Sequence, residues 1–283
     1  MMEIREKFKK YLQSKRFNLN YYYRIKPFLE YCQANNISLQ EITFEQYQNF
    51  ILTLTTKNLD AGTINNFINA VRHFYKFLIY RGDVNEDKLK EIYKLKLLKY
   101  QQKNKYFLTE EDLQELIKEA LTYIDWPPLK LKTLLYFWFY TGLRKSELLR
   151  LKREDIKLYK CEVNIRSPTK NAKERIVIFP KKLTYLLKDY FDSELEEDNA
   201  FNLSEGKLNY LIYKLKDCTP DRKISCHTFR HSFGFLLATH IKDIRIAQKL
   251  LGHSNIQSTI IYYNPSLKSI KEEYFNKIKI KNL

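Results

Sequence analysis

The fold is decided by the stretch His227-Thr-Phe-Arg230-His231, which is followed by Leu250-Leu-Gly-His253 and then by Tyr262. It places two imidazoles and a guanidinium at the start of one predicted helix. His227 and His231 have the spacing of a metal pair, but no HExxH glutamate and no third ligand candidate lies nearby in the sequence. We therefore expect neither a metal nor any other cofactor at this site.

Two further stretches lie upstream: Thr141-Gly-Leu-Arg144-Lys-Ser-Glu147-Leu and Thr169-Lys170-Asn-Ala-Lys173-Glu-Arg175. Each alone is weak evidence, because an arginine at a helix start usually makes a surface ion pair and a lysine in a turn is usually solvated. Together, the four motifs carry what metal-independent transfer of a phosphodiester requires. Guanidinium and imidazole groups stabilise the non-bridging oxygens, an ammonium protonates the leaving 5′-oxygen, and a tyrosine hydroxyl attacks the phosphorus.

The stretch from His227 to Tyr262 resembles the C-terminal motif block of the tyrosine recombinase (phage integrase) family. The match covers the family's HxxRH helix and its second imidazole position, His253. The family's nucleophile follows that imidazole by nine positions, which selects Tyr262 over its neighbour Tyr263. Thr141 to Leu148 resembles the segment of the first catalytic arginine, and weaker similarity extends to the N-terminus.

The resemblance implies a role for each matched residue. The expected catalytic residues are Arg144, Lys170, His227, Arg230, His253 and Tyr262, with Tyr262 as the nucleophile. Glu147 is expected to orient the site. Two departures leave alternatives open: Lys170 is flanked by Thr169 and Asn171 rather than by glycines, so Lys173 is a second candidate for the general acid. Alternating use of Tyr262 and Tyr263 is likewise an open alternative.

The charge indicates a polyanionic partner. The formal net charge is +17, with 19 Lys+Arg against 10 Asp+Glu up to Lys105 and 31 against 23 beyond it. Two basic halves suit a clamp that grips double-stranded DNA from two sides. The alternative explanation is an AT-rich genome, which favours lysine codons.

Hydrophobic periodicity predicts a mainly α protein in two parts. Residues 1–85 are expected to form a helical core-binding domain, 86–106 a basic linker, and 107–283 a catalytic domain that is α-rich with a small antiparallel β-sheet. Thr43-Phe-Glu-Gln46 resembles a capping box, and Gly82 is expected to end the helix over residues 63–81. Residues 161–165 and 175–179 alternate in polarity around turn-forming residues, which predicts a hairpin.

The resemblance further implies cleavage through a 3′-phosphotyrosine, with four protomers acting on two DNA sites. The apolar residues after Tyr262 predict a tail that docks either on a neighbouring protomer or on its own domain. Two alternatives to a recombinase stay open: a type IB topoisomerase and a non-catalytic DNA-binding relative. Within the recombinases, a Xer-like dimer resolvase and the integrase of a mobile element are both open.

The remaining composition favours a cytoplasmic protein. Cys32, Cys161, Cys218 and Cys226 show no CxxC pairing, so reduced thiols are expected. The longest apolar run, residues 134–140, is too short to span a bilayer. The chain opens with no signal-peptide pattern.

Overall fold

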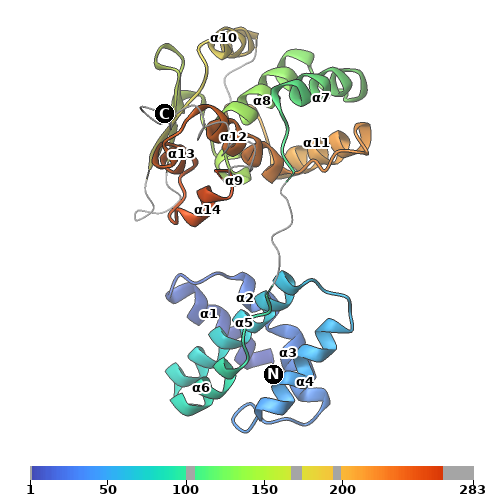
Figure 1. Ribbon diagram of the computed structural model, residues 1–283, viewed down its shortest axis with the longest axis vertical. Coiled ribbons are helices and arrows are strands. Elements are labelled where there is room, and N and C mark those ends of the chain that lie inside the picture. Colours follow the sequence, from blue (N-terminus) through green and yellow to red (C-terminus); the bar gives the residue numbers. More distant parts are fainter. Residues whose placement is uncertain (1, 100–105, 167–173, 194–198, 264–283) are drawn as a thin grey trace, which may run out of the picture. The chain divides into compact units, whose positions relative to one another are not determined.

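The computed structural model describes residues 2–99, 106–166, 174–193 and 199–263. The chain divides into two compact units, residues Met1–Lys103 and Asn104–Leu283, each with its own hydrophobic core. Figure 1 shows helices in both units and strands in the second one. A mainly α protein with a small antiparallel sheet was predicted and is confirmed.

The first unit is entirely helical over its described residues, and its longest helix forms the centre of the core. Phe74, Tyr75 and Phe77 of that helix, α5, are buried among the side chains of the other helices. The six helices are α1 (Met2–Ser14), α2 (Asn20–Arg24), α3 (Lys26–Ala34), α4 (Phe44–Thr55), α5 (Ala61–Arg81) and α6 (Glu86–Lys94).

Two local predictions in this unit are confirmed. Thr43 caps α4, and both hydrogen bonds of a capping box with Gln46 are present. Helix α5 ends at Gly82, which adopts the left-handed conformation (φ 78°) that glycine reaches without steric cost.

The segment predicted as a linker begins instead with helix α6. Asn85 caps this helix, and Ile92 is buried in the core of the first unit. The following residues run along α5, where the Asn65 amide bonds both backbone groups of Leu98 at 2.8 and 2.9 Å. The sequence pattern did not indicate this helix, because it is short, rich in lysine and has one buried apolar residue.

The second unit surrounds a nearly apolar helix, α8 (Pro128–Thr141), with further helices and a three-stranded antiparallel sheet in the order β1-β2-β3. The predicted hairpin is present as β2 (Glu162–Ile165) and β3 (Arg175–Ile178), with Val163 opposite Val177. Strand β1 (Ile156–Lys157) was not predicted. The other helices are α7 (Glu110–Tyr123), α9 (Lys145–Leu148), α10 (Leu183–Ser193), α11 (Glu205–Cys218), α12 (Cys226–His240), α13 (Ile244–Leu251) and α14 (Gln257–Ile260).

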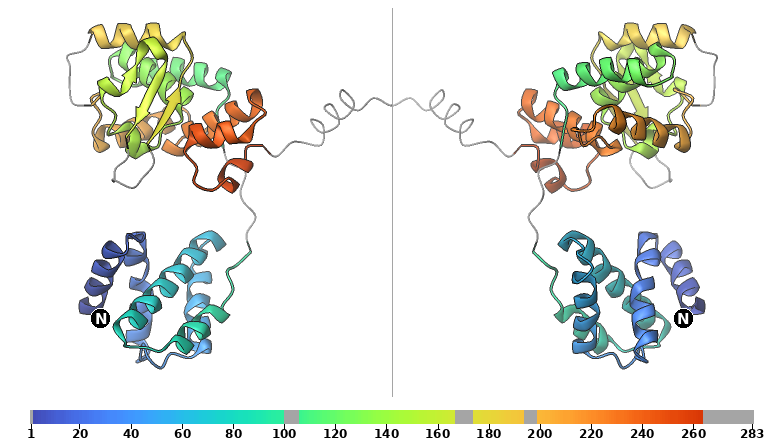
Figure 2. Two further views of the ribbon diagram at one scale, coloured as in Figure 1. Left: turned by 90° about the vertical axis from the view of Figure 1, so that its left-hand side faces the viewer. Right: turned by 90° about the vertical axis from the view of Figure 1, so that its right-hand side faces the viewer.

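The helices α8 and α12 fix the frame of the site. The indole of Trp138 on α8 stacks on Phe229 of α12, with ring centroids 4.5 Å apart and planes 6° from parallel. The indole N–H of Trp138 also donates to the carbonyl of Leu143, 2.8 Å away. This packing holds the turn after α8 against the start of α12. Figure 2 shows the helices and the sheet of the second unit from two further sides.

Candidate active site

Arg144 is the N-cap residue of α9, directly after the turn that ends α8. Gly142 caps α8 in the left-handed conformation, and its missing Cβ leaves room for the Phe233 ring of α12. The backbone N–H of Arg144 donates to Glu147 Oε2 (2.8 Å), and its Nη1 donates to Glu147 Oε1 (2.9 Å). Glu147, which the sequence predicts to orient the site, is thus in direct contact with Arg144.

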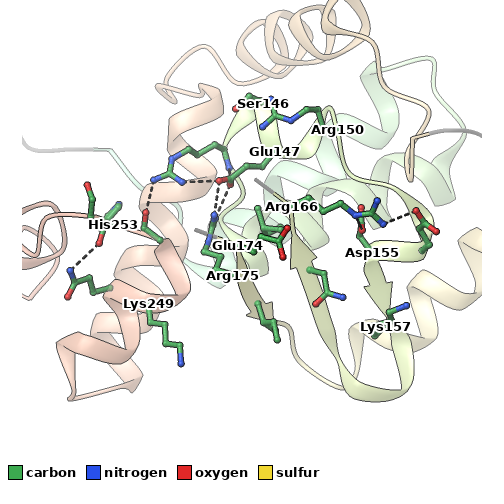
Figure 3. A pocket seen from close by; sticks show the side chains of 18 of the residues that line it. Ser146, Glu147, Arg150, Asp155, Lys157, Arg166, Glu174, Arg175, Lys249 and His253 are labelled. Atoms are coloured by element: carbon green, nitrogen blue, oxygen red, sulfur yellow. Dashed lines mark hydrogen bonds and ion pairs between the residues drawn. The ribbon is translucent and has the colours of Figure 1, made fainter. Parts of the chain in front are cut away.

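Glu147 is buried and is held chiefly by Arg175, a residue that the sequence did not single out. Arg175 at the start of β3 donates from Nη1 and Nη2 to the two carboxylate oxygens at 2.7 and 2.9 Å. Burial on its own would raise the pKa of Glu147, but the hydrogen bonds and charges of Arg175 and Arg144 outweigh it and lower the pKa to about 2. Glu147 is thus an anion between the cations Arg144 and Arg175, of which Figure 3 labels Arg175.

Three arginines bind three consecutive carbonyls at the end of α13. Arg175 Nε donates to the carbonyl of Leu250 (3.1 Å), Arg230 Nη2 to that of Leu251, and Arg144 Nη2 to that of Gly252 (3.1 Å). The last carbonyls of a helix lack partners within the helix and carry partial negative charge, so cations bind them favourably. These contacts connect α9, β3 and α12 to the turn that precedes His253.

Arg230 is the most deeply buried of these cations, with 5% of its surface exposed. Its Nη1 donates to the carbonyl of Gly142 at 2.9 Å. Burial, followed by the nearby charge of Arg144, lowers the pKa of Arg230 to about 10, so the group still carries its proton at neutral pH. A fixed buried guanidinium is suited to stabilising an oxyanion.

The two predicted imidazole positions differ in environment. His253 follows the αL residue Gly252, and its Nδ1 lies 2.9 Å from the Thr259 hydroxyl. His227 is exposed in the first turn of α12. Its ring centroid lies 6.2 Å from that of His231 on the same helix.

The two adjacent tyrosines make different contacts. The hydroxyl of Tyr262 lies 2.7 Å from Nδ1 of His231, and burial raises its pKa while the charge of Arg230 opposes that shift. The hydroxyl of Tyr263 donates to the backbone carbonyl of Ile241 at 2.8 Å. The hydroxyl of Tyr262 is therefore hydrogen-bonded to an ionisable group, whereas that of Tyr263 is bonded to the backbone.

A basic cleft of about 1660 Å³ opens beside Arg144, Glu147 and His253. Figure 3 shows side chains from the sheet and from α13 along its walls. Its lysines and arginines outnumber its carboxylates: Arg144, Arg150, Lys157, Arg166, Arg175, Arg245 and Lys249 against Glu147, Glu154, Asp155 and Glu174. Such a lining suits a polyanion.

Of the predicted residues, the structure connects Arg144, Glu147, Arg230 and the turn before His253 in one network, and it places Tyr262 against α12. Lys170 and Lys173 lie outside the described residues. The structure adds two contacts to which the sequence assigned no role: Arg175 binds Glu147 in this network, and His231 lies beside the Tyr262 hydroxyl. The sequence carried no signal for Arg175, because the burial of Glu147, which calls for a further cation, is a property of the fold.

Within the described parts of the chain, no group of three or more His, Cys, Asp or Glu residues is arranged to hold a metal ion. Over the same residues, none of the helices is both long and apolar enough to cross a bilayer.

The fold and this group of residues define a tyrosine recombinase, a class of enzyme that cleaves and rejoins DNA strands. The chain belongs to the phage integrase family, whose model matches residues 106–268, and the phage integrase N-terminal SAM-like domain matches residues 6–82. The resemblance found in the sequence is confirmed.

Curated relatives cover nearly the whole chain. The tyrosine recombinase XerD of Chlorobaculum tepidum is 30% identical over 261 residues, which is 87% of this chain and 84% of the relative. A tyrosine recombinase of Thermosipho africanus is 28% identical over 90% of this chain and 89% of its own length.

Solved structures share the fold at lower identity. The Tn1549 transposon integrase in complex with a circular intermediate DNA superimposes with a TM-score of 0.74, at 16% identity, over 96% of this chain and 98% of that one. The XerH recombinase bound to a palindromic difH substrate gives 0.70 at 22% identity, over 90% and 78% of the two chains.

Proposed function

We propose that this chain is a site-specific DNA recombinase in which Tyr262 attacks the scissile phosphate. The observation that carries the proposal is the contact of the Tyr262 hydroxyl with an imidazole, beside the buried charge of Arg230, in a chain of this family. The oxygen–phosphorus bond to Tyr262 forms as the bond to the 5′-oxygen breaks. The products are a 3′-phosphotyrosine and a free 5′-hydroxyl.

The other residues act on the phosphorane and on the leaving group. Arg144, Arg230, His227 and His253 stabilise the charge on the non-bridging oxygens, and Lys170 protonates the 5′-oxygen. Glu147 orients Arg144, to which it is bonded twice. The free hydroxyl of a partner strand then attacks the phosphotyrosine, so the energy of the phosphodiester is conserved and no metal, nucleotide or other cofactor takes part.

The assembly and setting follow from the same proposal. The first unit, helix α6 included, serves as the core-binding domain and the second unit as the catalytic domain, and four protomers act on two copies of a double-stranded DNA site. The protein works in the cytoplasm. The names of its relatives favour a Xer-like role in resolving replicon dimers, and the Tn1549 integrase keeps integration or excision of a mobile element as the second candidate.

Trapping of the covalent intermediate tests the proposal. A nicked suicide substrate carrying the organism's own recombination site loses the short strand after cleavage, so the enzyme stays attached. We expect a denaturant-resistant adduct with the wild type and with Tyr263→Phe, and none with Tyr262→Phe. An adduct lost only in Tyr263→Phe, or absent with every cognate site, would overturn the proposal, and relaxation of supercoils without site preference would indicate a topoisomerase.

A further inference from the structure

Gly234 on α12 leaves a space that the ring of Tyr262 fills, and we call this space the Tyr262 seat. A Cβ added to Gly234 would lie 2.6, 2.7 and 2.9 Å from Cε2, Cζ and Cδ2 of the Tyr262 ring, closer than non-bonded carbon atoms approach. The ring therefore lies directly against the helix backbone, in space that exists only because residue 234 has no side chain. His231 lies one helical turn earlier, on the same face of α12.

The hydroxyl in this seat meets a group that can take its proton. His231 Nδ1 lies 2.7 Å from the Tyr262 oxygen, which is hydrogen-bonding distance, and the two ring centroids lie 5.9 Å apart. The charged or titratable groups near His231 include Tyr262, the neighbouring Arg230, and His227, whose ring is 6.2 Å away. A phenol is a weak nucleophile until its proton is removed, and a neutral imidazole is the side chain best matched to that task near pH 7.

We infer that His231 is a catalytic residue that accepts the proton of the Tyr262 hydroxyl during strand cleavage, and that Gly234 is the positioning residue that seats the ring. The inference rests on the proposed function. The phenol proton passes to Nδ1 as the bond from oxygen to phosphorus forms, and the bond to the 5′-oxygen breaks with a proton supplied by the general acid. In the rejoining step His231 returns its proton to the departing phenolate.

The first test is His231→Asn, because the Asn amide keeps a hydrogen-bonding group near the Nδ1 position but is not a base. Single-turnover cleavage of the suicide substrate is measured between pH 5.5 and 9.5. We expect a wild-type rate that rises and then levels as the imidazole loses its proton. In His231→Asn the rate falls about 100- to 10,000-fold and keeps rising with pH, since hydroxide must then remove the proton.

His240→Asn is the matched control, because His240 is exposed near the other end of α12, where Nδ1 bonds the carbonyl of Leu236. It should leave rate, pH profile and DNA affinity unchanged. His231→Asn should also keep wild-type DNA affinity. Cleavage by His231→Asn at the wild-type rate and with the wild-type pH profile would overturn the inference. The proposed function would still stand in that case, provided that the covalent adduct with DNA is lost in Tyr262→Phe.

A substrate with sulfur in place of the 5′-bridging oxygen distinguishes removal of the Tyr262 proton from protonation of the leaving group. A thiolate leaves without a proton, so this substrate should restore cleavage to Lys170→Ala and not to His231→Asn. Restoration of His231→Asn would show that His231 acts on the leaving oxygen and would overturn the inference.

Gly234→Ala tests the seat separately. The added methyl should push the ring away from His231, so cleavage falls while DNA binding is retained. Gly206→Ala is its control, because Gly206 also lies in a helix, α11. A Cβ added there meets only Ser204 Oγ, at 3.8 Å. Wild-type cleavage by Gly234→Ala would show that the ring does not need this position.

Discussion

At the scale of single residues, Arg175 makes as many hydrogen bonds in the site as Arg144, three each, although the sequence pattern assigned no role to Arg175. Its side chain is 11% exposed, and its five N–H groups supply two bonds to Glu147 and one to the carbonyl of Leu250. Its partner Glu147 also binds Arg144, so the direction of the Arg144 guanidinium depends on Arg175. Arg175 is therefore a positioning residue for the arginine that is proposed to hold the phosphate.

Replacement of Arg175 with methionine should destabilise the catalytic unit and slow cleavage. The substitution leaves the buried Glu147 carboxylate with one cation fewer, which should lower the unfolding free energy by about 3–5 kcal/mol. Without Arg175, Glu147 should also move and shift Arg144, so the cleavage rate should fall about 100-fold. Urea unfolding and the suicide-substrate assay measure the two effects. Lys188→Met is the control, because Lys188 is an exposed cation of α10 that does not line the basic cleft. Equal losses in the two variants would contradict the role of Arg175.

Arg144, Glu147, Arg230 and Tyr262 were predicted as site residues because their types and order match a chemical task, and the structure brings the first three into one network. Arg175 was quoted in a motif but given no role, because its importance comes from a buried carboxylate 28 positions earlier in the chain. Long-range partners of this kind depend on packing, which local spacing does not encode.

At the scale of elements, the end of α13 brings the site together. Gly252 has φ +64°, and a Cβ there would lie 2.7 Å from Cδ and 2.8 Å from Nε of Arg175. The Arg175 side chain cannot move aside easily, because Glu147 and the Leu250 carbonyl hold it. Glycine is thus required twice, for the backbone conformation and for the space.

Gly252→Ala should therefore affect both stability and catalysis. The left-handed conformation alone costs about 1–2 kcal/mol for a residue with a Cβ, and displacement of Arg175 adds to that cost and misplaces His253. Gly82→Ala is the matched control, since Gly82 also has a positive φ (+78°) but a Cβ there meets nothing within 4 Å. Its cost should stay near the conformational value, with cleavage unchanged. Hydrogen exchange of each unit and the cleavage rate are the measurements, and unimpaired cleavage by Gly252→Ala would contradict the argument.

Elements with strong periodicity or clear caps were predictable, whereas short ones were not. Helices α4 and α5 and the hairpin follow from local patterns. Helix α6 and strand β1 are short, and each has only one buried residue, Ile92 and Ile156. Their structure depends on the surfaces against which they pack.

At the scale of the whole molecule, the two units have separate cores with no residue in common. A core defect in one unit should therefore leave the other folded. Phe74→Ala removes a fully buried ring from the first unit and should cost about 3–5 kcal/mol there, and Phe137→Ala should do the same in the second. Hydrogen exchange followed by mass spectrometry should show lost protection only in the substituted unit. Loss in both units from either variant would indicate a single cooperative structure.

The binding of three arginines to the end of α13 has a consequence for how the protein is made. A ribosome adds residues 144, 175 and 230 before it reaches the carbonyls at 250 to 252 that these side chains bind. A chain released early carries the cationic groups but lacks the backbone groups that fix them, and it also lacks Tyr262. With Tyr262 as the proposed nucleophile, such an incomplete chain could not form the covalent link to DNA, so the ability to break DNA would arise only when synthesis of the catalytic unit is nearly finished.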